Sequence, residues 1–590
     1  MTHTSRICVL FCLIYLVGLP GCGSTNSLQP TVVKPSGVVS LALTPSSISL
    51  PLNNSTASVS AILSGDNSAS LVLSVSGVPT GATALIAQPS TSSGGTISFD
   101  SGSADPGSYS LIAQASDPTG KVAASVTFQV IFGDVISILP TTTGQNNLRM
   151  STSAEIGWRN ISYSSDEQKK LVALAPSNFR LQAVQQAIPQ RSAGSWNFSN
   201  LDAATQPVLA VGDHSPEMQI AFAPAFMYDS NGALFDTTYS QVAEYAQNLV
   251  AYFNKGGFTV NSTHYASSSP YPITWWGIFN ENNYGSAKMT GAQYAALYDK
   301  VVPAMQSVDP SLHFVATEMG VSSSLNSTYL TGFVQQVSSQ VDALGVHFYS
   351  SSNQSDSDAK VFGTIPTFVT NLKAIRTILA SKSNLADTPI WVTENNVNAD
   401  HVNSTTGMSS IHPTLPFVLD QRGSSAFFAA WRPYLYSQFA IQGVRRLHSF
   451  EFEGDAQFGE MDRGGAYHLG YWVDQALKQE LNAESAPTIL TSSSTDSADV
   501  EVFPIRHADG HVTIMIVNHR VAASSDNNGN GALVQALVDF SALGSFTRGT
   551  LLMIDANTDV AFGPTQATIS ATSPVYVSFS GYGVAFLDLY

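Results

Sequence analysis

Charge and cysteine are both scarce in this chain of 590 residues. Only 11% of the residues are charged, and 25 basic against 42 acidic residues leave a net charge of −17. Nucleic acids and anionic membrane surfaces bind clustered positive charge, so this balance argues against both as partners. All three cysteines precede residue 23, which excludes a disulfide framework or a cysteine-based zinc site in the rest of the chain.

The sequence also lacks a run of about 18 apolar residues that could cross a bilayer. A shorter apolar run, Ile7 to Leu19, follows Arg6 in the manner of a signal peptide. It ends in Leu19-Pro20-Gly21-Cys22, which resembles the lipobox of bacterial lipoproteins. The resemblance implies that residues 1–21 are removed and that Cys22 carries a lipid. The protein would then be exported and anchored in the cell envelope, at the outer membrane or cell surface, with that lipid as its only membrane contact. An ordinary secretory signal that contains a cysteine is the alternative.

Two further segments precede the main domain. Residues 22–36 are rich in Ser, Pro and Gly and predict a flexible tether. Residues 37–134 hold short runs that alternate apolar residues with Ser or Thr, the pattern of half-buried strands. About seven such strands fit an antiparallel β-sandwich. The stretch at 71–116 resembles bacterial immunoglobulin-like modules attached to surface enzymes, so we expect a spacer without catalytic residues.

Between residues 135 and 484, apolar runs alternate with helical patterns. Apolar residues at helical spacing predict a helix over 242–253, and Thr290 with Gln293 forms a candidate capping box for another. Eight runs predict strands: near 150–158, and at 179–184, 218–226, 273–279, 313–319, 341–349, 389–394 and 444–450. Eight such repeats predict a (β/α)₈ barrel. An open doubly wound sheet is the alternative, but no glycine-rich phosphate loop follows any of the runs.

Residues 485–590 again contain short β-rich runs after a helix near 471–481. They predict a C-terminal β-sandwich that supports the barrel, and the strand near 135–139 is a further candidate member of it. The chain therefore predicts a multidomain protein with a β-sandwich at each end of a barrel.

The residues that end barrel strands face the active site of such a fold. Glu281 follows the fourth run and Glu394 ends the seventh, so their strands face each other across the barrel mouth. Breaking a glycosidic bond needs one carboxyl group to protonate the leaving oxygen and another to stabilise positive charge at the anomeric carbon. This pair predicts that chemistry, which requires no metal or organic cofactor.

Several segments carry a family resemblance. WWGIFNENNYG at 275–285 resembles the fourth-strand signature of clan A glycoside hydrolases, and PIWVTENNV at 389–397 resembles their seventh-strand signature. The segments 196–212, 245–258 and 341–349 are similar to glycoside hydrolase family 39 and its neighbours. The resemblance spans roughly 150–480. It implies a retaining O-glycosyl hydrolase that acts on β-glycosidic bonds of a poly- or oligosaccharide through a covalent glycosyl-enzyme.

The resemblance also implies a role for individual residues. Glu281 would be the general acid/base and Glu394 the nucleophile. Asn280 would bind the sugar 2-hydroxyl, Tyr349 would orient the nucleophile, and His347 would line the sugar subsite or support the acid. The remaining candidate substrate contacts are Arg180, Trp276 and Glu451. For Arg180 a structural ion pair beneath the site is the alternative, and for Trp276 it is core packing.

Some features leave alternatives open. Glu318 is a rival carboxylate whose flanking residues lack the expected pattern, and Phe450-Glu451-Phe452 stands where many clan members have a tryptophan. A catalytically silent polysaccharide-binding lipoprotein would keep the same cleft, and a transglycosylase would use the same residues. The sugar, the linkage, exo or endo action and the oligomeric state stay open.

Overall fold

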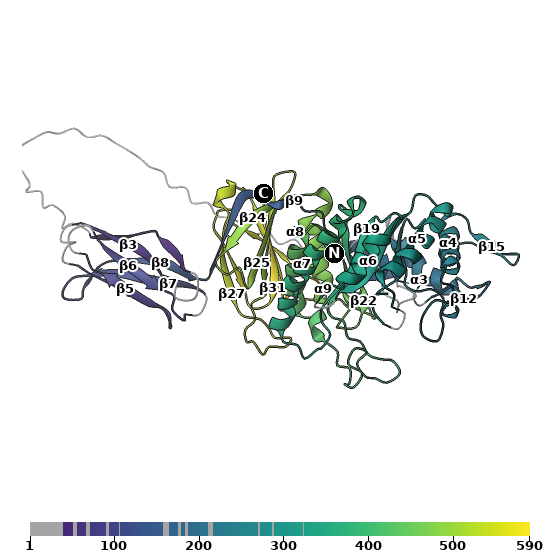
Figure 1. Ribbon diagram of the computed structural model, residues 1–590. Coiled ribbons are helices and arrows are strands. Elements are labelled where there is room, and N and C mark those ends of the chain that lie inside the picture. Colours follow the sequence, from purple (N-terminus) through teal and green to yellow (C-terminus); the bar gives the residue numbers. More distant parts are fainter. Residues whose placement is uncertain are drawn as a thin grey trace, which may run out of the picture.

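The computed structural model describes most of the chain beyond residue 38 (Figure 1). The described residues are 39–50, 56–65, 71–89, 94–104, 107–156, 165–174, 179–182, 184, 187–210, 216–268, 272–285, 288–321 and 324–590. The predicted signal peptide, the tether and Cys22 lie outside them. In Figure 1 the C-terminal sheet lies between the N-terminal β domain and the barrel.

The N-terminal domain consists of two four-stranded sheets with one shared core. Their strand orders are β1-β3-β6-β5 and β2-β8-β7-β4. Alternate residues of the strands point inward, and the buried ones include Val59, Phe99 and Leu111. The domain is a β-sandwich with eight strands, one more than the sequence pattern suggested. The strands are β1 (Ser40–Thr44), β2 (Ser47–Leu50), β3 (Thr56–Ser64), β4 (Val72–Ser76), β5 (Thr83–Ala87), β6 (Gly95–Asp100), β7 (Gly107–Ser116) and β8 (Val122–Phe132).

Eight parallel strands close into a barrel in chain order, which confirms the predicted (β/α)₈ fold. The strands are β10 (Ser151–Ile156), β11 (Arg180–Leu181), β14 (Glu217–Ile220), β17 (Trp275–Ile278), β18 (His313–Val321), β19 (Ala343–Ser351), β20 (Ile390–Asn398) and β21 (Val444–Ser449). Each lies within or overlaps one of the eight apolar runs. The second strand is much shorter than its run, with two residues paired on either side.

Helices surround the barrel with their apolar faces inward. The periodic residues of α4, among them Tyr245, Leu249 and Phe253, are buried, and α5 begins with the predicted capping box of Thr290 and Gln293. The helices are α1 (Ser165–Leu174), α3 (Ser199–Ala210), α4 (Ser240–Asn254), α5 (Gly291–Val308), α6 (Ser327–Gln336), α7 (Asp358–Ala380), α8 (Ala426–Ile441) and α9 (Leu469–Leu481). Short paired strands in the connections are β12 (Gln190–Ser192), β13 (Ser195–Trp196), β15 (Phe258–Val260), β16 (Thr263–Tyr265), β22 (Glu453–Gly454) and β23 (Met461–Asp462). In the part of the chain that the structure describes, no helix combines the length and apolar composition needed to cross a bilayer.

Aromatic side chains pack at the end of the barrel where the strands begin. The rings of Trp275 and Trp391 are 4.5 Å apart, and the guanidinium of Arg446 lies over both. Alternation along β17 turns the next residue, Trp276, outward, where it is fully buried and its ring is 6.5 Å from that of Phe253 on α4. The substrate contact predicted for Trp276 is therefore wrong, since it belongs to the layer between barrel and helices.

The C-terminal sheet has nine strands, in the order β29-β28-β31-β26-β25-β24-β9-β27-β30. Strands far apart in that order, such as β26 and β27, contribute to one buried cluster, so the sheet folds over its own core as a sandwich does. β9 (Asp134–Asn147) pairs with β24 and β27, so the residues just after 134 belong to this sheet rather than to the barrel. The other strands are β24 (Thr488–Ser494), β25 (Val500–Arg506), β26 (Val512–Asn518), β27 (Val534–Asp539), β28 (Gly549–Asp555), β29 (Gln566–Ile569), β30 (Val575–Phe579) and β31 (Gly583–Leu589).

A buried carboxylate joins the sheet to the barrel. Asp358, at the start of α7, accepts hydrogen bonds from the backbone N–H of Asn528 at 2.8 Å and of Gly529 at 2.9 Å. The guanidinium of Arg422 is 3.6 Å away. The C-terminal domain is thus attached rigidly to a helix whose preceding strand, β19, carries site residues.

Candidate active site

Two carboxylates and a histidine meet at the mouth of the barrel. Glu281 follows β17, His347 lies on β19 and Glu394 lies on β20. One carboxylate oxygen from each glutamate and a ring nitrogen of the histidine all lie within 4.8 Å of one another. His347 Nδ1 is 2.9 Å from Glu281 Oε1 and 3.4 Å from Glu394 Oε2. The sequence-predicted pair thus comes together over one small volume.

The two carboxylates differ in exposure. The side chain of Glu281 is 39% exposed, whereas that of Glu394 is 7% exposed. A partly exposed carboxyl group can exchange a proton with solvent, and a buried one keeps a fixed orientation. The arrangement therefore provides one group suited to proton transfer and one suited to direct attack.

Hydrogen-bond donors converge on Glu394. Tyr349 donates its hydroxyl to Oε2 at 2.9 Å, and Arg180 Nη1 donates to Oε1 at 2.9 Å, with Gln182 Nε2 at 3.2 Å from the same oxygen. Burial raises the pKa of Glu394, but the charges of His347 and Arg180 and the Tyr349 hydrogen bond outweigh it, so the pKa is lowered. Glu394 is held as a carboxylate.

The backbone that carries Glu281 is strained. Phe279 and Glu281 have φ values of 62° and 48°, in the left-handed region that non-glycine residues seldom adopt. The N–H of Glu281 donates to the carbonyl of Glu318 at 3.0 Å. Gly320 leaves room for the side chain, since a Cβ there would be 2.8 Å from Glu281 Oε1. Such strain persists only where the surroundings enforce it, and it is concentrated at functional sites.

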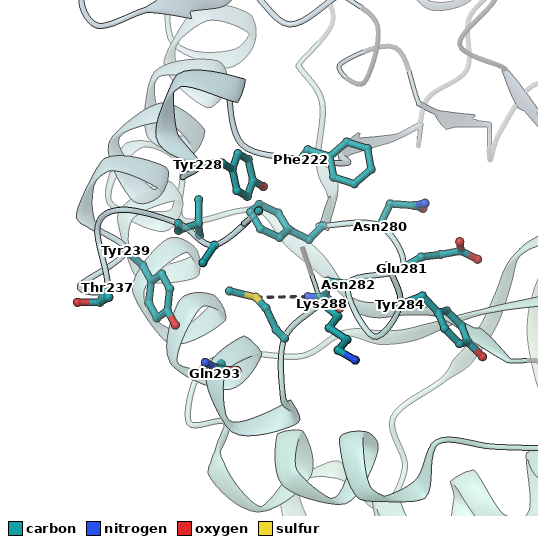
Figure 2. Close-up of a pocket in the computed structure, with 15 residues that line it drawn as sticks. Phe222, Tyr228, Thr237, Tyr239, Asn280, Glu281, Asn282, Tyr284, Lys288 and Gln293 are labelled. Atoms are coloured by element: carbon teal, nitrogen blue, oxygen red, sulfur yellow. Dashed lines mark hydrogen bonds between the residues drawn. The ribbon is translucent and has the colours of Figure 1, made fainter. Parts of the chain in front are cut away.

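The side chain of Asn280 is oriented by two donors inside the barrel, Arg180 and Gln219. Its Oδ1 accepts hydrogen bonds from Arg180 Nη2 at 2.8 Å and from Gln219 Nε2 at 2.6 Å. With the oxygen taken up by two donors, the amide nitrogen is the group left to donate toward the cleft. In Figure 2 the side chains of Asn280 and Glu281 point to the same side of their turn.

A pocket of about 170 Å³ lies beside that turn, and Asn280 and Glu281 are among the residues that line it. Figure 2 shows Tyr228 and Tyr239 on the side away from the tips of Asn280 and Glu281. The tyrosines share the lining with Phe279, Met289 and a mixture of apolar and polar residues. The turn that bears Glu281 thus forms part of the wall of this pocket.

Arg180 is buried beneath the two carboxylates rather than exposed to a substrate. All five of its N–H groups are used: Nε donates to Glu318, Nη1 to Glu155 and Glu394, and Nη2 to Asn280 and Glu318. The direct substrate contact predicted for Arg180 is wrong, and the alternative of an ion pair beneath the site holds. Its role is to connect Glu394 with Asn280.

Three buried carboxyl groups surround Arg180, and only Glu318 among them was singled out from the sequence, as a rival carboxylate. They are Glu155 on β10, Glu217 on β14 and Glu318 on β18, each inaccessible to solvent. Burial raises the pKa of all three, and the charge of Arg180 offsets this only in part. The sequence marks each of them only as an acidic residue within or beside an apolar run.

Glu451 is also buried, and its predicted contact with substrate stays a prediction. Its backbone N–H donates to the carbonyl of Phe458 at 2.8 Å, and its charge contributes to the raised pKa of Glu155. The aromatic residue at the end of β21 is Phe450, whose ring centroid is 6.3 Å from that of Tyr349 in an edge-to-face arrangement.

Among the described residues, Glu281, His347 and Glu394 are the one group whose atoms lie close enough together for a metal ion. A hydrogen bond accounts for the same proximity, because His347 Nδ1 and Glu281 Oε1 are 2.9 Å apart.

A family model described as "Alpha-L-arabinofuranosidase 1 domain" matches residues 205–366. The matched segment begins within α3 and ends within α7, and it contains Glu281 and His347, while Glu394 lies beyond it. No curated protein matches the sequence.

Solved structures share the fold of the described barrel and C-terminal sheet. A monomeric β-xylosidase from Caulobacter crescentus CB15 is 16% identical with a TM-score of 0.52, covering 77% of this chain and 99% of that one. A GH51 arabinofuranosidase from Xanthomonas axonopodis pv. citri is 13% identical with a TM-score of 0.52, covering 78% and 99%. A glucosidase from Croceicoccus marinus is 16% identical with a TM-score of 0.50, covering 78% and 99%. At these identities the likeness establishes the fold, and the three names refer to three different sugars.

Proposed function

We propose that this protein is a retaining glycoside hydrolase that cleaves β-glycosidic bonds of a poly- or oligosaccharide. The observation that carries the proposal is the separation of at most 4.8 Å between carboxylate oxygens of Glu281 and Glu394. Retaining enzymes hold their two carboxyl groups about 5–5.5 Å apart, whereas inverting enzymes leave about 6.5–9.5 Å for a water molecule. The short separation favours direct attack by one of the carboxylates. The match to an arabinofuranosidase domain and the shared fold of glycosidases support the same class of reaction.

The reaction proceeds in two displacements. Glu394 attacks the anomeric carbon while Glu281 gives its proton to the leaving oxygen, so the glycosidic bond breaks as an ester bond to Glu394 forms. Glu281, now a carboxylate, then takes a proton from a water molecule that attacks the same carbon and releases Glu394. His347, at hydrogen-bond distance from Glu281, orients its carboxyl group in both steps.

Two contacts act on the transition state. The Asn280 amide donates to the 2-oxygen of the sugar, an interaction that strengthens as positive charge develops at the neighbouring carbon. Tyr349 keeps Glu394 ionised and aligned until the ester forms. Phe450, beside Tyr349, offers an apolar surface to the sugar ring.

An assay of wild-type protein and Glu394→Gln tests the proposal. The substrates are aryl β-D-xyloside, β-D-glucoside and α-L-arabinofuranoside, together with plant and bacterial polysaccharides. We expect wild-type hydrolysis of at least one substrate, a loss of about 10³-fold or more in Glu394→Gln, and a product whose anomeric configuration is retained. The exposed Glu244 on α4 supplies a matched control, Glu244→Gln, which should hydrolyse at the wild-type rate.

Two results would contradict the proposal. Hydrolysis by neither protein would leave a silent polysaccharide-binding cleft, and an inverted product would exclude the covalent intermediate.

We also propose that the protein is exported and anchored in the bacterial envelope by a lipid on Cys22, with the N-terminal sandwich as spacer. The lipobox-like Leu19-Pro20-Gly21-Cys22 supports this. Metabolic labelling with a clickable fatty acid should mark the wild-type protein but not Cys22→Ser. Equal labelling, or none in either, would contradict the anchor.

A further inference from the structure

Beneath the catalytic carboxylates, two buried carboxyl groups face each other inside the barrel. Glu217 on β14 and Glu318 on β18 both lie close to the Cα of Gly277 on β17 between them. A Cβ built on Gly277 would be 1.9 Å from Glu318 Oε1 and 2.6 Å from Glu217 Oε1. A Cβ on Gly345 of β19 would be 2.6 Å from Glu318 Cγ. Two glycines on neighbouring strands therefore make the space in which the two groups meet.

The oxygens of Glu217 and Glu318 that face each other accept no hydrogen bond from other groups in the described part of the chain. Neither oxygen of Glu217, nor Oε1 of Glu318, accepts a hydrogen bond from any N–H or O–H group within the described residues. Both Oε1 atoms instead lie within 2.6 Å of the same point, the Cβ position of Gly277, so the two carboxyl groups face each other there. Two carboxylates that share a site cannot both ionise, and a hydrogen bond between them requires a proton.

The other oxygen of Glu318 serves as an anchor. Oε2 accepts from Arg180 Nε at 2.9 Å, from Arg180 Nη2, and from Gln219 Nε2 at 2.8 Å. The same Arg180 and Gln219 also donate to Asn280, and Arg180 donates to Glu394. Glu318 is thus one contact away from both groups that act on the sugar.

We propose that Glu217 and Glu318 share one proton and that the resulting monoanionic pair holds Arg180 and Gln219 where they orient Glu394 and Asn280. Both are positioning residues, and this part of the inference rests on the proposed glycosidase function. Glu217 has no other hydrogen-bond donor, so the proton lies mainly on Glu217, while Glu318 bears the charge that faces Arg180.

Several other charged or titratable groups surround the pair. They are Glu155 on β10, Arg180 on β11, Tyr294 on α5, His347 on β19, Glu394 on β20 and Arg446 on β21. A second negative charge on the pair would draw Arg180, which donates to both Glu318 and Glu394, away from Glu394. A single charge on the pair keeps Arg180 available to Glu394.

The test uses the isosteric variants Glu217→Gln, Glu318→Gln and the double variant in the full-length protein. In either single variant the new amide N–H takes the place of the shared proton and one negative charge remains, so kcat/KM should stay within about 10-fold of wild type. The double variant removes the negative charge of the pair and leaves Arg180 with Glu155 and Glu394 alone. Its kcat should fall by about 100-fold or more, beyond the product of the two single effects, with KM little changed. The acid limb of its pH profile should move to lower pH, because a negative charge near Glu394 is gone.

Infrared spectroscopy tests the proton itself without reference to activity. The difference spectrum between wild type and Glu217→Gln at neutral pH should contain the C=O band of one protonated carboxyl group, and thermal unfolding should show both proteins folded. A difference spectrum with carboxylate bands alone would overturn the shared proton. Single variants that each lose as much kcat as the double variant would overturn the single shared charge. A protein that shows the band but hydrolyses nothing would refute the glycosidase function and leave the pair standing.

Discussion

Removal of one hydroxyl group, in Tyr349→Phe, tests how the nucleophile is held. The Tyr349 hydroxyl donates to Glu394 Oε2 at 2.9 Å, and burial together with the charge of Glu394 raises the pKa of Tyr349 well above its usual value. The hydroxyl therefore stays protonated and donates at every pH at which the protein is folded. The variant deletes this donor and leaves the ring in place.

The magnitude follows from the type of bond. A hydrogen bond to a charged group contributes about 1.5–3 kcal/mol. If all of it supports the carboxylate and its alignment, kcat/KM falls by about 10- to 150-fold, since about 1.4 kcal/mol corresponds to a factor of ten. The hydroxyl is one of the groups that lower the pKa of Glu394. Without it that pKa rises, so the acid limb of the kcat/KM profile moves to higher pH.

The assay is a pH profile of kcat/KM on the best aryl glycoside, with Tyr298→Phe as control. Tyr298 is also buried, but its hydroxyl donates to the carbonyl of Gln340, away from the site. The control should lose stability without any shift of the acid limb. A Tyr349→Phe profile that superimposes on wild type would refute the assignment of Tyr349 to the nucleophile.

Three other substitutions probe separate parts of the structure. Gly277→Ala should lower the free energy of unfolding by about 1–3 kcal/mol in a denaturant titration, because the new methyl group overlaps Glu318 and Glu217; unchanged stability would contradict the packing described. Asn280→Ala should lower kcat/KM by about 100-fold on 2-hydroxy glycosides and far less on 2-deoxy glycosides, since its amide binds the 2-oxygen. Equal losses of kcat/KM on the two kinds of glycoside would exclude that contact. Asp358→Ala should lower the free energy of unfolding by about 3–5 kcal/mol, because it removes a buried carboxylate between α7 and the C-terminal sheet. The kcat measured at low temperature should stay at the wild-type value. Loss of kcat without loss of stability would refute this structural role.

The elements that depend on local pattern were predictable from sequence. The eight barrel strands follow from apolar runs, and the start of α5 follows from the capping box at Thr290. Glu281 and Glu394 could be chosen because strand ends converge in a barrel, so their position along the chain implies their position in space.

The layer beneath them could not be predicted in the same way. Arg180 was singled out, but its partners depend on the registers of five different strands. Glu318 lies within a register shift of β18, where Thr317 and Glu318 take positive φ, so simple alternation along the strand does not give the direction of its side chain. β9 joins a sheet whose other strands begin about 340 residues later, a pairing that no local pattern contains. What the sequence could not supply was register and long-range pairing.

The covalent intermediate offers the most direct test of the account. The wild-type protein is incubated with the 2-deoxy-2-fluoro form of whichever aryl glycoside it hydrolyses fastest, and the labelled peptide is identified by mass spectrometry. We expect one sugar attached to Glu394, and none on Glu281 or Glu318. A sugar on another carboxyl group, or hydrolysis of the parent glycoside with inverted configuration and no adduct, would contradict it.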